Sequence, residues 1–236
     1  PKYSGDTAWR TGQLLCVGGG RQILRHLTPN WLFMRLSVSI IIPVLNEEAS
    51  IAAALGRLAD AQVPGVEILV VDGGSDDASV SRALPLSDAV IIAPRGRAAQ
   101  MNAGAKHARG DILLFLHADT RLPDNWRTAV LEGLAEGTHD WGRFDVSIEG
   151  SSIALPVIAA MMNLRSRWTG IATGDQAIFV RRDTFEAVGG FPEILLMEDI
   201  AVSKLLKRFT PPVCLKQKVE TSGRRWEKNG VLRTIV

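Results

Sequence analysis

The sequence has little cysteine, few aromatic residues and no long uninterrupted apolar run. Its two cysteines, Cys16 and Cys214, provide neither a disulfide framework nor a Cys-x-x-Cys metal pair, so a reducing, cytoplasmic compartment is expected. No apolar run reaches the ~18 residues of a membrane-spanning helix. The amino-terminal residues do not resemble a secretory signal, because Gly, Arg and Pro interrupt their short apolar stretches. At most, we expect peripheral contact with the inner face of a membrane.

The net charge is also small. A formal charge of +2 over 236 residues does not indicate a nucleic-acid partner. Hydrophobic residues make up 46% and charged residues 22%, a balance typical of a globular protein rather than a disordered one. The length suits one large α/β domain.

The regular part of the sequence begins late. The chain opens with Pro1, and Met34 stands just before the first strong strand pattern. We expect residues 1–36 to be an extension outside the native fold, residues 37–236 to form a single domain, and that domain to be truncated after Val236.

From Ser37 onward, apolar runs alternate with helical patterns. Pro43 is expected to end the first strand, and Asn46 to act as the N-cap of the helix that follows. Continuous apolar strands between helices indicate a mostly parallel central sheet flanked by helices, an α/β fold. The strands are predicted at 38–42, 66–71, 89–92 and 112–116, with helices near 51–58 and 98–108 and a short one after Asp77.

The second half of the sequence is less regular. Predicted helices cover 126–135, 153–163 and 199–207, and predicted strands cover 141–148 and 177–180. The stretch 153–168 is apolar and then basic, so it could lie on a membrane surface or line a binding groove. Burial in the core is favoured.

Polar residues gather where the predicted strands end. In parallel sheets, ligands bind outside the carboxyl ends of the strands. Asp119, two residues after His117, suits a divalent cation that bridges phosphate oxygens, or alternatively a helix N-cap. Asp72 could accept hydrogen bonds from a base or a ribose, or could be a turn residue before Gly73.

Other charged residues have two interpretations each. The pair Glu198 and Asp199 could cap a helix or supply a general base. Arg95, Arg97, Lys106 and the pair 224–225 could stabilise a departing nucleoside diphosphate, or form a solvated basic face. Trp226 could stack on a ligand or lie in the core.

One tempting motif fails. The glycines 18–20 could open a phosphate-binding loop, but Ile23 occupies the last position of the Gly-x-Gly-x-x-Gly pattern.

Three segments taken together are similar to the signature segments of family 2 glycosyltransferases with the GT-A fold. They are Ile40–Glu48, Asp72–Asp77 and His117–Asp119, and Gly96–Gly104 resembles the family's helix after the third strand. The resemblance extends from about Ser37 to Trp226. It implies that residues 37–120 bind a nucleotide-sugar and that residues 121–236 bind the acceptor.

A narrower resemblance lies in the second half. Thr173–Gln176, Met197–Asp199 and Ser222–Trp226 resemble the bacterial transferases associated with radical-SAM/selenodomain gene neighbourhoods, which are also described as arsenosugar-biosynthesis glycosyltransferases.

The family resemblance implies roles for individual residues. Asp119 ligates Mg²⁺ or Mn²⁺, and Asp199 is the base of an inverting single displacement, with Glu198 beside it. The donor is a UDP- or GDP-sugar, and the acceptor is a small molecule or is lipid-linked. The residues implied to bind the nucleotide-sugar are Pro43, Asn46, Glu47, Asp72, Arg97, His117 and Arg225, and those implied to bind the acceptor are Gly174, Asp175, Gln176 and Trp226.

The sequence departs from the family pattern at two positions. His117 replaces the first acid of Asp-x-Asp, which puts the metal preference in doubt. Ser222 replaces the Gln of the Gln-x-x-Arg-Trp motif of processive synthases, so a single transfer is expected. The alternatives are a nucleotidyltransferase, for which the acidic segment 43–48 lacks the basic Gly-rich loop, and a non-catalytic nucleotide-binding protein.

Overall fold

The computed structural model describes residues 36–59, 64–135 and 137–224. The predicted extension over residues 1–36 therefore lies outside the described residues, except for its last residue. The glycines 18–20, Arg225 and Trp226 also lie outside them.

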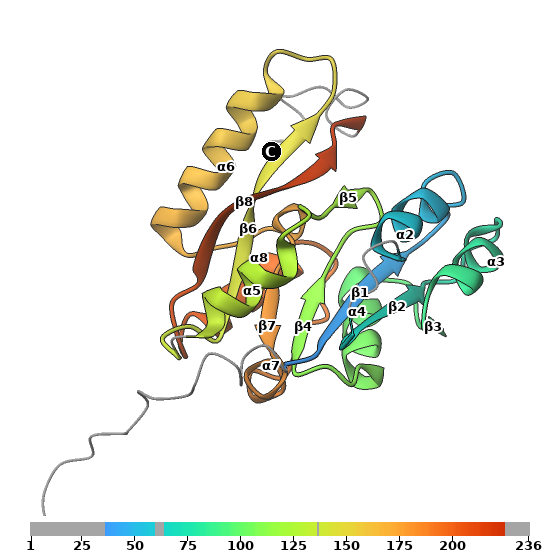
Figure 1. Cartoon of the computed structure of the whole chain (residues 1–236), viewed down its shortest axis with the longest axis horizontal. Coiled ribbons are helices and arrows are strands. Elements are labelled where there is room, and N and C mark those ends of the chain that lie inside the picture. The colour runs from blue at the N-terminus through green and yellow to red at the C-terminus, as the bar shows by residue number, and fades with distance from the viewer. Residues whose placement is uncertain (1–35, 60–63, 136, 225–236) are drawn as a thin grey trace, which may run out of the picture.

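One mixed sheet runs through the described part of the chain (Figure 1). Its first half is parallel, as predicted, because β1 pairs in parallel with β2 and β4, and β2 with β3. Its second half is mixed: β7 is antiparallel to β4 and β6, β8 is parallel to β6, and β5 is antiparallel to β8. In spatial order the eight strands are β3 (Ala89–Ile92), β2 (Val66–Asp72), β1 (Val38–Val44), β4 (Ile112–Phe115), β7 (Phe179–Arg181), β6 (Trp141–Glu149), β8 (Val213–Ser222) and β5 (Thr120–Arg121).

Helices cover both faces of this sheet. Side chains along a strand alternate between its two faces: Ile40 packs in a core with Leu55 and Trp126, whereas Ile41 packs in a second core with Met101 and Val202. This arrangement confirms the predicted α/β fold. The helices are α2 (Ile51–Ala59), α3 (Ser79–Ala83), α4 (Arg97–His107), α5 (Trp126–Ala135), α6 (Leu155–Thr169), α7 (Arg182–Ala187) and α8 (Glu198–Leu206), with 3₁₀ turns η1 (Leu84–Leu86) and η2 (Gly174–Gln176).

Pro43 lies inside β1 and does not end it, contrary to the prediction. The carbonyl of Ile41 accepts the N–H of Leu116, whereas the carbonyl of Val44 accepts the N–H of Gly73. Peptide groups alternate between the two neighbouring strands, so the missing N–H of Pro43 is on the β4 side. Pairing with β4 accordingly stops at Ile41, and pairing with β2 continues to Val44. The proline thus separates β1 from β4 at the carboxyl edge of the sheet.

The prediction that Asn46 caps the next helix is also wrong. Helix α2 begins at Ile51. Just before it the chain forms a turn, in which the carbonyl of Glu47 accepts the N–H groups of Ser50 and Ile51. Asn46 has a left-handed backbone with φ 54°, which asparagine tolerates better than most residues. Its side chain is used elsewhere, in a contact described below.

Strand β8 is the largest element that the sequence interpretation missed, and β5 and α7 were missed too. Along β8, the buried residues Leu215, Val219 and Thr221 alternate partly with exposed Lys216 and Lys218. The interruption of a strict period of two corresponds to a register shift in the pairing of β6 with β8.

The favoured core burial of the segment 153–168 is wrong for most of it. Helix α6 buries Leu155, Ile158, Ala159 and Ser166, and its opposite side is exposed. The helix also continues to Thr169, further than predicted. Among the described residues, no helix is both long and apolar enough to span a membrane.

Candidate active site

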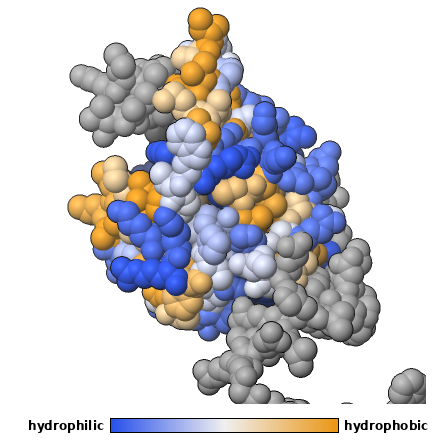
Figure 2. All heavy atoms as spheres, turned by 90° about the vertical axis from the view of Figure 1, so that its left-hand side faces the viewer, coloured by the Kyte–Doolittle hydropathy of each residue, from blue (hydrophilic) through white to orange (hydrophobic). Residues whose placement is uncertain are grey.

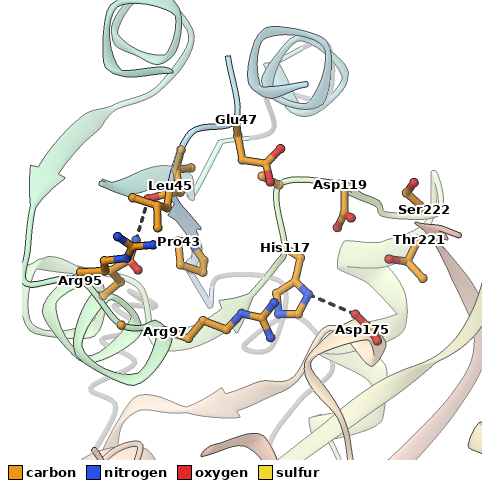
Figure 3. A pocket seen from close by; sticks show the side chains of 14 residues that line it. Pro43, Leu45, Glu47, Arg95, Arg97, His117, Asp119, Asp175, Thr221 and Ser222 are labelled. Atoms are coloured by element: carbon orange, nitrogen blue, oxygen red, sulfur yellow. Dashed lines mark hydrogen bonds and ion pairs between the residues drawn. The ribbon is translucent and has the colours of Figure 1, made fainter. Parts of the chain in front are cut away.

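A cavity of about 310 Å³ opens at the carboxyl edge of the sheet, where Pro43 separates β1 from β4 (Figure 3). Loops after β1 and β4, the start of α4 and the end of β8 surround it. The lining residues are Pro43, Val44, Leu45, Glu47, Arg95, Gly96, Arg97, Gln100, His117, Ala118, Asp119, Asp175, Thr221 and Ser222.

The loop after β1 is fastened to the loop after β2. The N–H of Asn46 donates to Ser75 Oγ at 2.9 Å, and Asn46 Oδ1 accepts the N–H of Asp76 at 3.0 Å. The N–H of Glu47 donates to Ser79 Oγ at 2.8 Å. Asn46 is exposed and does not line the cavity, but it holds the loop that carries Glu47 into it.

Asp72 closes the loop after β2. Its carboxylate is buried and accepts the N–H groups of Gly74 and Ser75 at 2.9 and 3.0 Å and the hydroxyl of Ser75 at 2.5 Å. The structure therefore shows the predicted turn role. Asp72 is not among the residues that line the cavity, and its contact with a base stays a prediction.

Gln100 forms part of the cavity floor, and the sequence interpretation did not single it out. Its buried amide nitrogen donates to the carbonyls of Val44 and Val71, at 2.8 Å each. These carbonyls lie at the ends of β1 and β2, so a single side chain joins the two strands beneath the cavity. Its place within Gly96–Gly104, the segment that resembles the family's helix after the third strand, was the signal that could have indicated this residue.

The start of α4 supplies positive charge to the cavity. Gly96 precedes the helix with φ 140°, a conformation that only glycine adopts readily. Arg95 and Arg97 flank it, and both are exposed. Arg97 points across the cavity in the direction of His117 (Figure 3). Two guanidinium groups beside the unpaired N–H groups of a helix start favour an anionic ligand.

His117 connects the β4 loop to η2. Its Nδ1 lies 3.2 Å from Asp175 Oδ1, and both side chains face the cavity. The ring packs directly on Gly174, where a Cβ atom would lie 2.6 Å from His117 Nε2. Glycine at 174 is therefore required by close approach. Gln176 is buried, and its Oε1 accepts the N–H of Thr173 at 3.2 Å, so it shapes η2 from within.

Asp199 lies on the other side of η2, in the first turn of α8. Its Oδ2 accepts the N–H of Gly174 at 2.7 Å, and its Oδ1 accepts the N–H of Ile200 at 2.7 Å. Each oxygen keeps a further lone pair for a ligand. Glu198 beside it is buried. Neither acid lines the cavity itself, but Asp199 is joined to it through Gly174 and its neighbour Asp175.

Asp119 lies in the cavity wall and is exposed, between β4 and β5. The alternative that it caps a helix is wrong, because β5 follows it and α5 begins only at Trp126. The described residues contain no cluster of three His, Cys, Asp or Glu side chains able to enclose a metal. One exposed carboxylate still suits Mg²⁺, which is usually held by one or two carboxylates together with substrate phosphates and water.

Strand β8 brings two hydroxyl groups to the cavity: that of Thr221, which the sequence interpretation missed, and that of Ser222, which it noted only as a departure from the Gln-x-x-Arg-Trp motif. Thr221 and Ser222 line it opposite α4, and Thr221 Oγ1 accepts a hydrogen bond from Thr120 Oγ1 at 3.2 Å. The partial alternation along 213–222 was the signal that could have indicated Thr221. Of the predicted donor-side residues, Pro43, Glu47, Arg97 and His117 meet in the cavity, as do Asp119 and Asp175.

The fold is that of the GT-A glycosyltransferases. A mannosyltransferase of Pyrobaculum calidifontis, solved with GDP-Man and Mn²⁺, has a similar structure, with a TM-score of 0.62 and 24% identity, covering 79% of this chain and 56% of that one. S. aureus TarS (residues 1–349), solved with UDP-GlcNAc, gives a TM-score of 0.63 at 19% identity, covering 79% and 58%. These likenesses confirm the GT-A fold.

The family is shown by the sequence itself. Residues 39–185 match the model of glycosyl transferase family 2, and the chain belongs to this family. It is 31% identical over 155 residues to an undecaprenyl-phosphate 4-deoxy-4-formamido-L-arabinose transferase of Shewanella sediminis, an alignment that covers 61% of this chain and 47% of that protein. The chain thus spans about half the length of this relative.

Proposed function

We propose that this protein transfers a sugar from a UDP- or GDP-sugar to an acceptor hydroxyl, with a divalent metal, in a single displacement that inverts the anomeric centre. One observation carries the proposal: a single cavity at the strand ends combines Arg95 and Arg97 with Asp119 opposite them. Cations beside a metal-binding carboxylate suit a diphosphate that must depart with its charge stabilised.

The donor half of the site follows from the loops after β1 and β2. Pro43 and Glu47 line the cavity and would contact the nucleotide-sugar directly. Asn46 and Asp72 would act largely through the loops they hold, with Asp72 also close to the base. Arg97 and His117 would bind the phosphates or the ribose, and Arg225, outside the described residues, would add a further positive charge.

Asp119 would hold Mg²⁺ or Mn²⁺ against the diphosphate. The metal, when bound, neutralises the charge that develops on the departing diphosphate. Because Asp119 is exposed and the described residues form no group of three potential metal ligands, the diphosphate and water would supply the remaining oxygen ligands. His117 is a softer ligand, and its ring is already engaged with Asp175.

Asp199 would act as the general base. It takes the proton of the acceptor hydroxyl as that oxygen bonds to the anomeric carbon and the bond from this carbon to the diphosphate breaks. Two backbone N–H groups hold the carboxylate in a fixed orientation, and its free lone pairs are available to the hydroxyl. Buried Glu198 beside it would support this position.

The acceptor would lie against Gly174, Asp175 and Gln176, with Trp226 contributing from outside the described residues. The Shewanella relative is named as acting on undecaprenyl phosphate, which supports a lipid-linked acceptor here. We further propose membership of the radical-SAM/selenodomain-associated subgroup, which rests on the sequence segments 173–176, 197–199 and 222–226.

Donor binding tests the proposal. Isothermal titration with UDP- and GDP-sugars, with and without Mn²⁺, is compared for the wild type, Asp119→Asn and Asp124→Asn. Asp124 is an exposed carboxylate outside the cavity and serves as the matched control. We expect Mn²⁺ to tighten binding in the wild type and the control, and Asp119→Asn to lose about tenfold or more of that affinity. An equal effect of Mn²⁺ on all three proteins would refute the metal assignment.

A further inference from the structure

Helix α6 has one side fastened to the sheet. Leu155 and Ile158 pack in the core, and the Asn163 side chain bonds both backbone groups of Val146 on β6, at 2.9 and 3.0 Å. Arg167 pairs with Asp145, which also accepts the buried Arg143. The orientation of α6 about its own axis is therefore fixed.

The opposite side of α6 presents an apolar stripe to solvent. The stripe residues are Ile153, just before the helix, and Val157, Met161, Leu164 and Trp168, which are 94%, 60%, 65%, 46% and 81% exposed. Their spacing of three or four residues places them along one side of the helix, over roughly 22 Å. Figure 2 views this side of the molecule and shows apolar residues projecting at its top, where α6 begins.

The charges on α6 itself have one sign. Helix α6 contains no acidic residue, and Arg165 is exposed beside the stripe. At its carboxyl end, Lys207 Nζ bonds the carbonyl of Thr169, and exposed Arg208 and Phe209 follow directly.

This end of α6 is coupled to the proposed catalytic acids. Ser203 of α8 bonds both backbone groups of Ala172, at 3.1 and 3.3 Å, and Gly174 follows two residues later with its bond to Asp199. A second group of exposed apolar side chains directly precedes Glu198: Ile194, Leu195, Leu196 and Met197.

We propose that the outer face of α6 lies on an anionic lipid surface. Apolar side chains on one side of a helix, exposed Trp and Phe, and exposed arginine and lysine are the features of helices that rest in the membrane interface. A second copy of this face offers no acidic residue on α6 to pair with the cations, whereas anionic headgroups do. The contact would hold the protein at the lipid surface, where a lipid-linked acceptor is available; this consequence rests on the proposed function.

Vesicle co-sedimentation tests this inference without any nucleotide-sugar, so its outcome is independent of the proposed sugar transfer. Vesicles of phosphatidylglycerol and phosphatidylcholine in equal parts are compared with phosphatidylcholine alone. The variants are Val157→Glu/Met161→Glu and Arg165→Glu. The matched control is Ile92→Glu, an equally exposed apolar position on β3, at the far edge of the sheet from β6 and β8.

We expect the wild type and Ile92→Glu to bind the anionic vesicles and to be released by salt. The double variant should lose about tenfold or more of this binding, and Arg165→Glu about fivefold on anionic vesicles. Since these positions are exposed, circular dichroism should show all variants folded. Absence of wild-type binding, or equal loss in Ile92→Glu, overturns the inference. A dimer in sedimentation velocity that only the double variant dissociates, without vesicle binding, assigns the face to a second copy instead.

Discussion

The N–H of Gly174 donates to the Asp199 carboxylate at 2.7 Å, and this bond joins the proposed base to the wall of the donor cavity. Gly174 also lies against His117, which pairs with Asp175. A short chain of contacts therefore runs from the loop that carries Asp119 to the first turn of α8. The relative position of metal-binding acid and base depends on η2.

Gly174→Ala tests this dependence. The added Cβ would lie 2.6 Å from His117 Nε2, so either the ring or η2 must move. We expect kcat/KM to fall by about 10²-fold, because catalysis is sensitive to misplacement of about 1 Å. Steady-state kinetics provide the measurement. The control is Gly56→Ala on α2, where nothing lies within 4 Å of the new Cβ and activity should not change. Equal activity of the two variants would contradict the account.

Gln100 is predicted to stabilise the floor of the cavity. Gln100→Met removes a buried donor to the carbonyls of Val44 and Val71, although the Val44 carbonyl keeps its bond from the N–H of Gly73, and this loss should cost about 1–2 kcal/mol of unfolding free energy. Gln100→Glu should be less stable still, since a carboxylate would face these carbonyls. Urea unfolding monitored by circular dichroism gives the order. Wild-type stability in both variants would show that the bridge is unimportant.

Asn102 is predicted to position the segment 191–197, which leads to Glu198 and Asp199, without contacting either acid. Its amide donates to the Phe191 carbonyl at 2.8 Å and accepts the Phe191 N–H at 2.9 Å, which fixes the segment leading to Glu198. Asn102→Ala should lower kcat while leaving donor affinity near the wild-type value. Asn102→Asp, which can still accept the N–H, should lie between them. Isothermal titration measures the donor affinity, and steady-state kinetics measure kcat. A loss confined to donor affinity would rule out this role.

Stability should fall in acid through carboxylates at the amino edge of the sheet. Burial alone would raise the pKa of Asp111, but hydrogen bonds from the N–H and hydroxyl of Ser37 hold this pKa below its usual value. A lowered folded-state pKa stabilises the protein above the ordinary pKa of about 3.9, and this contribution is lost as pH falls through the folded value. Burial would likewise raise the pKa of Glu67, but hydrogen bonds from Ser39 and Arg109 hold this pKa below its usual value.

Asp111→Asn isolates that contribution. We expect it to destabilise the protein slightly at neutral pH, because solvent screens this exposed carboxylate, and to flatten the decline in unfolding free energy as the pH falls below the ordinary pKa of about 3.9. Urea titrations at successive pH values measure both effects. A variant whose pH profile runs parallel to that of the wild type would show that Asp111 does not contribute.

The first half of the fold was predictable because each strand there is a continuous apolar run. Such runs predict strands buried on both faces, and polar residues after them identify the binding edge. This reasoning correctly brought Glu47, His117 and Asp119 together. It wrongly made Asn46 the N-cap of the helix after β1, because the Asn46 amide oxygen accepts the N–H of Asp76 across the loop, a tertiary contact that local pattern does not reveal.

The second half was less predictable for physical reasons. Strand β8 contains a register shift against β6, which interrupts its alternation, so the strand and its cavity residue Thr221 were not recognised. Helix α6 is apolar on two sides, and only the packed structure shows which side is buried. Gln100 satisfies carbonyls on two strands, a role that depends on the spatial order of β1 and β2.

The most direct test of the central claim compares Asp199→Asn with wild type for Mn²⁺-dependent donor cleavage, measured as release of nucleoside diphosphate, with donor binding measured on the same samples. Asparagine can still accept the N–H of Gly174 but cannot take a proton. The account predicts unchanged donor affinity and a rate lower by about 10²-fold or more. Cleavage at the wild-type rate with intact donor binding would contradict the assignment of Asp199 as the base.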